Sequence, residues 1–324
     1  MRYLVTGGAG FIGSHTVDEL VRRGHSVTVL DDLSAGKEGN LSGMLDKIEF
    51  IHGSICDLAA VQQACRGADY VFHLAARTSV PGSVKDPLET NRVNVDGTLN
   101  VLVAARDAKV RRVVYAASSA AYGETPALPK VETMAPVPIS PYGVTKLVGE
   151  IYAQAFGHAY GLENASLRYF NVFGPRQDPS SPYSGVLSRF IFALLSGEQP
   201  VVFGDGQQSR DFTFVEDVVS ANLKACEAPG ASGKAFNVGT SLRTTLNEVL
   251  KVLEKISGNP VRATFSPARA GDILHSQADI RLAGEVLGYK PRVPFAEGLQ
   301  RTWEWYRTAY MDAPKQTTPS RNVS

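Results

Sequence analysis

The amino-acid sequence predicts an α/β fold in which a doubly wound parallel sheet is joined by a smaller C-terminal α/β lobe. Apolar, β-branched runs alternate with stretches of helical period through the first half of the chain. Runs this apolar are typical of strands buried on both faces, and the helices between them supply right-handed crossovers. A glycine-rich turn follows the first run, and Gly-Pro and Asp-Pro pairs after Asn171 end the regular alternation. These observations indicate one sheet and a second, differently built unit.

The first half of the chain is expected to hold the strands and crossover helices of the sheet. The expected strands are residues 3–6, 26–30, 48–52, 70–74, 112–116 and 165–169. The expected helices are residues 14–23, 59–65, 93–108 and 142–160. Strands and helices alternate in chain order, which is the pattern of an open parallel sheet.

The second half is expected to build most of the smaller lobe. Helical periodicity recurs at residues 185–195, 215–225, 246–256, 280–287 and 295–310, and short strand patterns at 201–203, 235–238 and 262–265. We expect residues 1–171 to form the sheet domain, with segments from about 201–240 returning to it. Residues 172–311 then form mainly the second lobe, and the polar stretch 312–324 a flexible tail.

Composition excludes several classes of function. The chain has 324 residues, with 33 Lys and Arg against 32 Asp and Glu, a net charge of +1. Broad attraction to nucleic acid or to an anionic membrane is therefore not expected. The cysteines Cys56, Cys65 and Cys226 lack metal-site spacing, and no apolar run reaches the ~18 residues of a membrane span. We expect a soluble cytoplasmic protein with a small-molecule ligand, no metal and no nucleic-acid or membrane partner.

The glycine turn has the spacing of a dinucleotide site. Gly7, Gly10 and Gly13 lie between the first strand and the first helix. Glycine lets the backbone approach a pyrophosphate, and the helix N-terminus offers free N–H groups and a positive dipole end. Asp31 and Asp32 end the second strand, at the distance expected of a ribose-binding carboxylate. A carboxylate there repels a 2′-phosphate, so the sequence predicts a Rossmann-type domain that binds NAD rather than NADP.

A phenol and an ammonium group form a second constellation. Tyr142 and Lys146 are four residues apart, and so share one face of the expected helix. Ser118 and Ser119 close an apolar strand, where open α/β sheets place site residues. A nearby ammonium and a positive nicotinamide ring would both favour the phenolate. Without the serine pair and the glycine turn, the preferred interpretation of Tyr142 would be a helix-start aromatic after Pro141.

Together these motifs resemble the extended short-chain dehydrogenase/reductase family. The resemblance rests on the glycine turn, His73-Leu74-Ala75-Ala76, Asn94, Ser118-Ser119, Tyr142-x-x-x-Lys146 and the run Arg168 to Gly174, in that order. Within the family, the chain is most similar to UDP-sugar 4-epimerases of the UDP-glucose and UDP-N-acetylglucosamine type, from Met1 to about Tyr310.

The resemblance implies an epimerase mechanism and a role for each matching residue. Bound NAD takes hydride from C4 of the sugar, the 4-keto sugar rotates, and hydride returns to its other face. Tyr142 is then the base, Lys146 binds the nicotinamide ribose and depresses the tyrosine pKa, and Ser118 hydrogen-bonds the reacting oxygen, with Ser119 assisting or replacing it. The family commonly forms homodimers through the helices at 93–108 and 142–160.

The same resemblance assigns binding positions. Those implied for NAD are Gly7, Gly10, Phe11, Ile12, Gly13, Asp31, Asp32, Ser34, Ser54, Ile55, Leu74, Ala75, Ala76, Asn94, Ser118, Tyr142, Lys146 and Phe170. Those implied for the UDP-sugar are Arg77, Ser118, Tyr142, Asn171, Val202, Phe203, Arg210, Arg269, Asp272 and Ser276. Arg210 and Arg269 are expected to bind the diphosphate, since guanidinium groups form strong, often bidentate hydrogen bonds to phosphate.

Departures from the family pattern narrow the expected substrate and reaction. Ser54 stands where relatives carry an adenine-contacting Asp, and Asp57 does not inherit that role. Ser276 matches a position that is tyrosine in enzymes restricted to unacetylated sugars, which favours UDP-GlcNAc/UDP-GalNAc interconversion, alone or with UDP-Glc/UDP-Gal. Ala120 and Ala121 stand where dehydratases carry an Asp-Glu pair.

Two alternatives remain open at this point. One is another NDP-sugar enzyme of the same family, a dehydratase, decarboxylase or reductase. The other is a non-catalytic protein that senses NAD, although such proteins typically lose the tyrosine or the lysine and both are present here.

Overall fold

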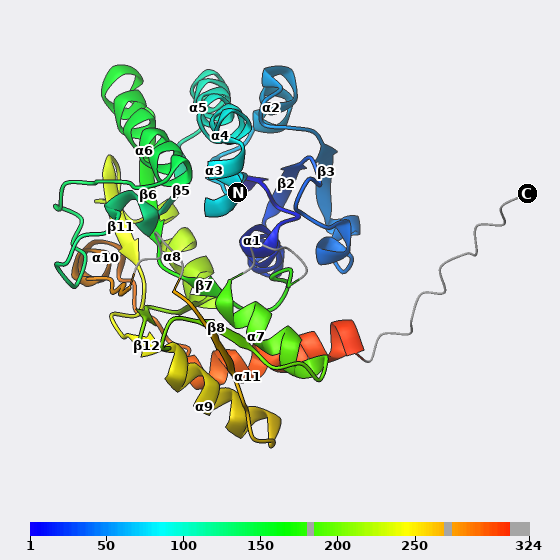
Figure 1. Cartoon of the computed structure of the whole chain (residues 1–324). Coiled ribbons are helices and arrows are strands. Elements are labelled where there is room, and N and C mark those ends of the chain that lie inside the picture. The colour runs from blue at the N-terminus through cyan, green and yellow to red at the C-terminus, as the bar shows by residue number, and fades with distance from the viewer. Residues whose placement is uncertain (180–184, 269–273, 312–324) are drawn as a thin grey trace, which may run out of the picture.

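A seven-stranded parallel sheet forms the centre of the larger unit. The computed structural model describes residues 1–179, 185–268 and 274–311. The strands run in the order β11-β6-β5-β4-β1-β2-β3 (Figure 1). Their bounds are β1 Arg2–Thr6, β2 Ser26–Asp31, β3 Ile48–His52, β4 Tyr70–His73, β5 Arg112–Ser118, β6 Glu163–Tyr169 and β11 Lys234–Val238. The expected doubly wound sheet is confirmed, since strand order reverses between β1 and β4.

Both faces of the sheet are buried, as the apolar strand runs predict. On β1, Tyr3 and Val5 point into one apolar cluster and Leu4 into the other, because successive side chains alternate across a strand. Helices α1 (Phe11–Arg22), α8 (Val215–Glu227) and α10 (Arg281–Leu287) cover the first face. Helices α2 (Leu58–Cys65), α5 (Gly97–Asp107) and α6 (Pro141–Tyr160) cover the second.

The segment between β4 and α5 differs from the sequence expectation. Two short helices, α3 (Val80–Lys85) and α4 (Pro87–Asn91), precede α5 and were not predicted. Each begins at a side-chain cap: Ser79 accepts from Gly82 N and Asp86 from Glu89 N. A π-helical turn, Arg92–Asp96, then interrupts what was expected to be one continuous helix. Such insertions are frequent at functional sites.

In the part of the chain that the structure describes, the second lobe contains three helices and three pairs of short strands. The helices are α7 (Val186–Leu195), α9 (Leu246–Ser257) and α11 (Phe295–Tyr306), the last continued by a π turn at Arg307–Met311. The paired strands are β7 (Val172–Phe173) with β10 (Thr213–Phe214), β9 (Ser209–Arg210) with β12 (Thr244–Thr245), and β8 (Val201–Phe203) with β13 (Thr264–Ser266). The three helices and strands β7, β8 and β10 share a third apolar cluster.

The chain crosses between the two units more than once. β8 and β9 lie in the second lobe, whereas α8 and β11 return to the large sheet. β11 pairs with β6 along its length, and Phe170 N, just past β6, donates to Val238 O at 2.9 Å. Buried Arg112 of β5 donates to the last carbonyl groups around the end of α8, and so fastens that helix to the sheet.

Within residues 1–179, 185–268 and 274–311, every helix is too short or too polar to cross a membrane.

Candidate active site

The glycine turn forms a cradle that side chains would fill. Gly7 has φ +70°, and a Cβ there would lie 2.7 Å from the backbone nitrogen of Ala75. A Cβ on Gly13 would lie 2.0 Å from Gly7 O, so glycine is required at both positions. Helix α1 begins at Phe11, and Gly10 has no side chain to cap its free N–H groups. The cradle and the helix end fit the pyrophosphate of a dinucleotide.

The two acids after β2 have different partners. Asp31 is buried, and its two oxygens accept from Ala9 N at 2.9 Å and Leu33 N at 2.8 Å. Asp31 therefore braces the glycine turn, while each oxygen keeps a further lone pair for a ribose. Asp32 accepts from Ser34 N at 3.0 Å. Burial works against ionisation of Asp32, but hydrogen bonds from Ser34 and Ser54 together with the charge of Arg77 outweigh it and lower the pKa of that carboxyl.

Residues at the end of β3 border the same edge of the sheet. Ile55 is buried, and Ser54 Oγ accepts from Cys56 N at 3.3 Å. Asp57 instead caps α2, accepting from Ala59 N at 2.9 Å, so its carboxylate is used within the helix, in agreement with the sequence interpretation. Asn40 is a residue that sequence reasoning missed: its Nδ2 donates to Ala9 O at 2.8 Å and steadies the turn.

A buried hydrogen-bond chain begins at β1 and runs through His73. Thr98 Oγ1 donates to Asn94 O at 2.6 Å, so its oxygen must accept from His73 Nε2–H at 2.9 Å. His73 Nδ1 then accepts from Thr6 Oγ1 at 2.8 Å. Burial, followed by the nearby Lys146 ammonium, lowers the pKa of His73 to about 3, so the ring is neutral.

Asn94 extends this chain to the helix that carries Tyr142. Its Oδ1 accepts from Arg77 N at 2.7 Å, and its Nδ2 donates to Arg77 O and to Thr145 Oγ1. Thr145 Oγ1 donates in turn to Tyr142 O at 2.9 Å. Asn94, expected to contact NAD, thus has both amide hydrogens engaged by the protein, and only an Oδ1 lone pair is left for a ligand.

Helix α6 presents Tyr142 to the serine turn at the end of β5. Ser140 caps the helix, and Pro141 occupies its first turn. A Cβ on Gly143 would lie 2.8 Å from Ala120 O, so this glycine permits the close approach. Ser118 starts the turn Ser119–Tyr122, and its side chain hydrogen-bonds Tyr142. The structure therefore brings Ser118 and Tyr142 together, as the resemblance implies.

Lys146 lies one helical turn further along α6, and its side chain is buried. Its Nζ donates to Ala116 O at 2.8 Å and lies 5.1 Å from the centre of the Tyr115 ring. Burial lowers the pKa of Lys146 to about 7. Burial also raises the pKa of Tyr142, against the Ser118 hydrogen bond. The phenolate expected from the sequence is thus not favoured by the protein alone, because desolvation outweighs the neighbouring groups.

A cavity of about 260 Å³ lies in the second lobe. Of the expected substrate positions, Asn171, Phe203 and Arg210 line it. Val202 does not: it packs into the third apolar cluster while its neighbour Phe203 faces the cavity, as strand alternation requires. Arg77 does not line it either, since its Nη2 lies 3.5 Å from Glu89 on the other unit.

Hydrogen bonds order the wall of this cavity. Asn171 Nδ2 donates to the Oγ of buried Ser276 at 3.1 Å, and Ser276 N donates to Ser209 O. Arg210 Nη1 donates to Ser209 O at 3.1 Å and to Leu274 O at 3.0 Å. Asp211 is fully buried and accepts four hydrogen bonds from the 240–241 turn and Ala278. This carboxylate, next in the chain to Arg210 of the cavity wall, therefore joins the 240–241 turn to the segment at Ala278.

Sequence reasoning missed other residues of the cavity wall. They include Gln177, Arg189, Gln208, Phe212 and Leu246. Of these, Gln208 and Phe212 lie in the run Gly206 to Phe212 that contains Arg210, and sequence spacing held little signal for the rest. The predicted Arg269, Asp272 and tail 312–324 lie outside the described residues.

The remaining cofactor positions lie along the carboxyl edge of the sheet. Leu74, Ala75 and Ala76 follow β4, and the backbone of Ala75 touches the glycine turn. Phe170 follows β6 and is buried, its ring 6.3 Å from that of Tyr122. Among the described residues, no group of three or more His, Cys, Asp or Glu side chains is placed to hold a metal ion.

Fold and site together define an enzyme of the extended short-chain dehydrogenase/reductase class. The sequence profile of the NAD dependent epimerase/dehydratase family matches residues 3–239. The chain belongs to this family, so its dinucleotide is NAD, and the resemblance drawn from the sequence is confirmed.

Close relatives cover nearly the whole chain. A UDP-glucose 4-epimerase of Mycolicibacterium smegmatis is 43% identical over 312 residues, which are 95% of this chain and 99% of the relative. The structure of a UDP-glucose 4-epimerase from Thermotoga maritima with UDP-glucose superposes with a TM-score of 0.91 at 41% identity, covering 95% and 99%. A UDP-N-acetylglucosamine 4-epimerase from Methanobrevibacter ruminantium M1 in complex with UDP-N-acetylmuramic acid gives 0.92 at 40%, covering 95% and 98%.

Burial of Lys146 predicts a specific pH dependence of stability in the cofactor-free protein. Below about pH 7, folded and unfolded chains both carry the ammonium, and the folded state bears the full cost of burying it. Above pH 7 the unfolded chain binds more protons, so stability rises with pH until the unfolded amine also titrates. Lys146→Met should therefore stabilise the protein most below pH 7, and the gain should shrink toward about pH 10.

Thermal unfolding of both proteins across this pH range measures the effect. Lys251→Met, at an exposed position of α9, controls for the loss of an amine. A stability difference between wild type and Lys146→Met that does not change with pH would contradict the assignment.

Proposed function

We propose that this protein is a UDP-sugar 4-epimerase. The observation that carries the proposal is the separation of two sites. The Ser118–Tyr142 pair lies at the carboxyl edge of the large sheet, the same edge as the dinucleotide cradle. The cavity with Arg210 lies in the second lobe. A 4-keto sugar must rotate without escaping, and this is achieved when the nucleotide diphosphate is held away from the reacting carbon.

Each residue at the sheet edge has a defined task in this reaction. NAD, when bound, supplies the acceptor and donor of hydride at C4. Tyr142 takes the proton of the 4-hydroxyl and returns it, and Ser118 hydrogen-bonds the same oxygen. Lys146, whose pKa burial lowers, contributes positive charge beside the tyrosine when protonated and binds the nicotinamide ribose. The Asn94–Thr145 bonds hold the first turn of α6 in place for this proton transfer.

The serine turn favours epimerisation over dehydration. Removal of water after C4 oxidation needs an acid and a base close to C5 and C6 of the sugar. The turn Ser119–Tyr122 instead carries Ala120 and Ala121, which cannot transfer protons. Turnover is then redox-neutral, with no net consumption of NAD.

Replacement of the proposed base tests the mechanism. Tyr142→Phe should lower kcat for 4-epimerisation of UDP-glucose and UDP-GlcNAc by about 10²–10⁴-fold, because the ring remains but the proton acceptor is lost. NAD content, measured by chromatography after denaturation, should stay at the wild-type level. Epimerisation by the variant at more than about a tenth of the wild-type rate would contradict the mechanism.

The position of Ser276 supports acceptance of an N-acetylated sugar. Ser276 is small, is bonded to Asn171 of the cavity wall, and belongs to a strand-like segment held against Ser209. A large side chain there would occupy space next to the sugar, whereas serine leaves room for an acetamido group. We therefore propose interconversion of UDP-GlcNAc and UDP-GalNAc, alongside UDP-Glc and UDP-Gal.

Two substitutions at this position separate volume from hydrogen bonding. Ser276→Tyr should lower kcat/KM for UDP-GlcNAc about 100-fold while UDP-Glc changes only a few-fold, since added volume excludes the acetamido group. Ser276→Ala removes the bond to Asn171 without adding volume, and should keep both activities. Equal losses for both substrates in Ser276→Tyr, or no wild-type turnover of UDP-GlcNAc, would refute the assignment.

The exposed face of α6 supports a homodimer. Val144 and Ile151 are 44% and 54% exposed and lie on one face of the helix, seven residues apart. An apolar stripe on one helix can pair with its own copy across a two-fold axis. In light scattering, the wild type should have twice the chain mass of 34.8 kDa. Ile151→Lys should lower the measured mass from that of the dimer to that of one chain. Leu242→Lys, on the second lobe, should leave the dimer mass unchanged. A monomeric wild type would contradict the proposal.

A further inference from the structure

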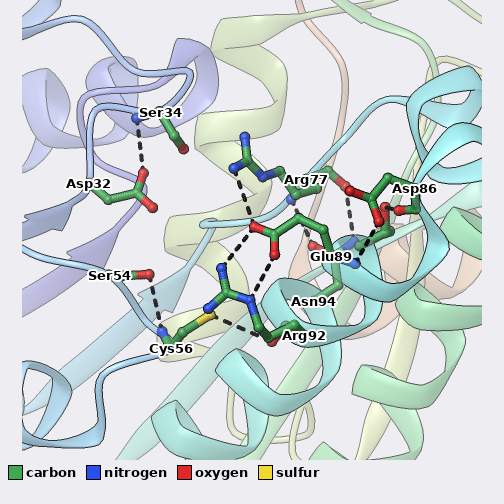
Figure 2. A network of polar contacts seen from close by, with 10 residues as sticks. Asp32, Ser34, Ser54, Cys56, Arg77, Asp86, Glu89, Arg92 and Asn94 are labelled. Atoms are coloured by element: carbon green, nitrogen blue, oxygen red, sulfur yellow. Dashed lines mark hydrogen bonds and ion pairs between the residues drawn. The ribbon is translucent and has the colours of Figure 1, made fainter.

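A glutamate clamps two arginines beside the carboxyl ends of β2, β3 and β4. Glu89 of α4 accepts from Arg92 twice, through Nε at 2.7 Å and Nη2 at 2.8 Å. The same carboxylate lies 3.5 Å from Arg77 Nη2 (Figure 2). All three side chains are partly exposed to solvent, by 32% for Glu89, 40% for Arg77 and 55% for Arg92.

This cluster borders the adenosine end of the NAD site. Arg77 follows Ala75 and Ala76, which abut the glycine turn, and Asn94 fixes its backbone on both sides. Figure 2 shows Asp32 and Ser54 across from Arg77 and Arg92. The carbonyl of Arg92 accepts from Cys56, which is joined in turn to Ser54.

The charges of the cluster bear directly on the choice of dinucleotide. The charge of Arg77 lowers the pKa of Asp32, and the charge of Asp32 raises the pKa of Arg92. Both guanidinium groups therefore interact electrostatically with Asp32, the expected ribose-binding carboxylate. Two such groups would attract the 2′-phosphate that distinguishes NADP from NAD, since guanidinium forks bind phosphate well. The acid at position 32 alone therefore does not determine selectivity.

We propose that Glu89 is a specificity-determining residue that keeps the site selective for NAD by occupying and neutralising Arg77 and Arg92. With Glu89 and Asp32 ionised, the two acids balance the two arginines. Without the Glu89 charge, the arginines carry a net positive charge and free donors toward a 2′-phosphate. Arg77 and Arg92 then bind the 2′-phosphate of NADP.

The chain contains a matched control for this substitution. Glu19, in the last turns of α1, also holds two arginines, with Arg22 and Arg23 at 2.7 Å and 2.8 Å. Glu19→Gln makes the same chemical change at the end of α1 remote from the glycine turn. Any general effect of releasing two surface arginines should appear equally in both variants.

The experiment is equilibrium dialysis of the purified proteins against equal concentrations of NAD and NADP, with the bound nucleotides measured by chromatography after denaturation. Dialysis is continued until samples loaded first with either nucleotide agree. Glu89→Gln should raise the bound NADP:NAD ratio about tenfold over wild type. A change of this size is expected from one additional charge-assisted contact to the phosphate. Glu19→Gln should leave the ratio unchanged.

Two further measurements identify the source of the gain. It should fall as salt is raised, because exposed charges are screened, and Arg92→Gln added to Glu89→Gln should remove it. An unchanged ratio in Glu89→Gln, an equal rise in Glu19→Gln, or a gain that survives loss of Arg92 would overturn the proposal. The readout is nucleotide binding, so it is independent of the sugar that the enzyme epimerises.

Discussion

The backbone contact between the glycine turn and the segment after β4 is the constraint on which the whole site depends. A side chain on Gly7 would collide with Ala75, so the two segments meet as bare backbone. Because β1 and β4 are neighbours in the sheet, this contact also sets Thr6 against His73. The buried hydrogen bonds that start there end at the helix of Tyr142. The dinucleotide cradle and the helix that carries Tyr142, the proposed base, are therefore one connected structure.

The residues proposed for proton transfer and those proposed to bind the nucleotide sugar lie mainly in different units of the molecule. The groups proposed to transfer protons lie at the sheet edge, where Lys146 is buried and Tyr142 is partly buried, and desolvation shifts the pKa values of both. The groups proposed to hold the substrate lie mainly in a lobe with its own apolar cluster, where the buried carboxylate of Asp211 joins the 240–241 turn to Ala278. Because the net charge of the chain is only +1, its positive groups act through a few local sites rather than through a long-range electrostatic field.

Much of the fold was predictable because burial on two faces leaves a strong apolar signal in each strand. The parallel strands and the crossover helices were found at nearly their true positions. The short helices α3 and α4 and the two-residue strands β7, β9, β10 and β12 were not, since caps and tertiary neighbours create them. The π turn at Arg92–Asp96 left no periodic mark either, although it carries Asn94.

For the site, the sequence by itself determined which residues are candidates for the chemistry: the glycines, Tyr142, Lys146 and Ser118 have spacings that local geometry makes meaningful. Only the tertiary structure decided their state and partners. Burial reversed the expected direction of the Tyr142 pKa, strand alternation turned Val202 into the core, and Arg77 lies against Glu89 rather than in the cavity of the second lobe. Desolvation and long-range pairing depend on segments distant in the chain, and no local pattern encodes them.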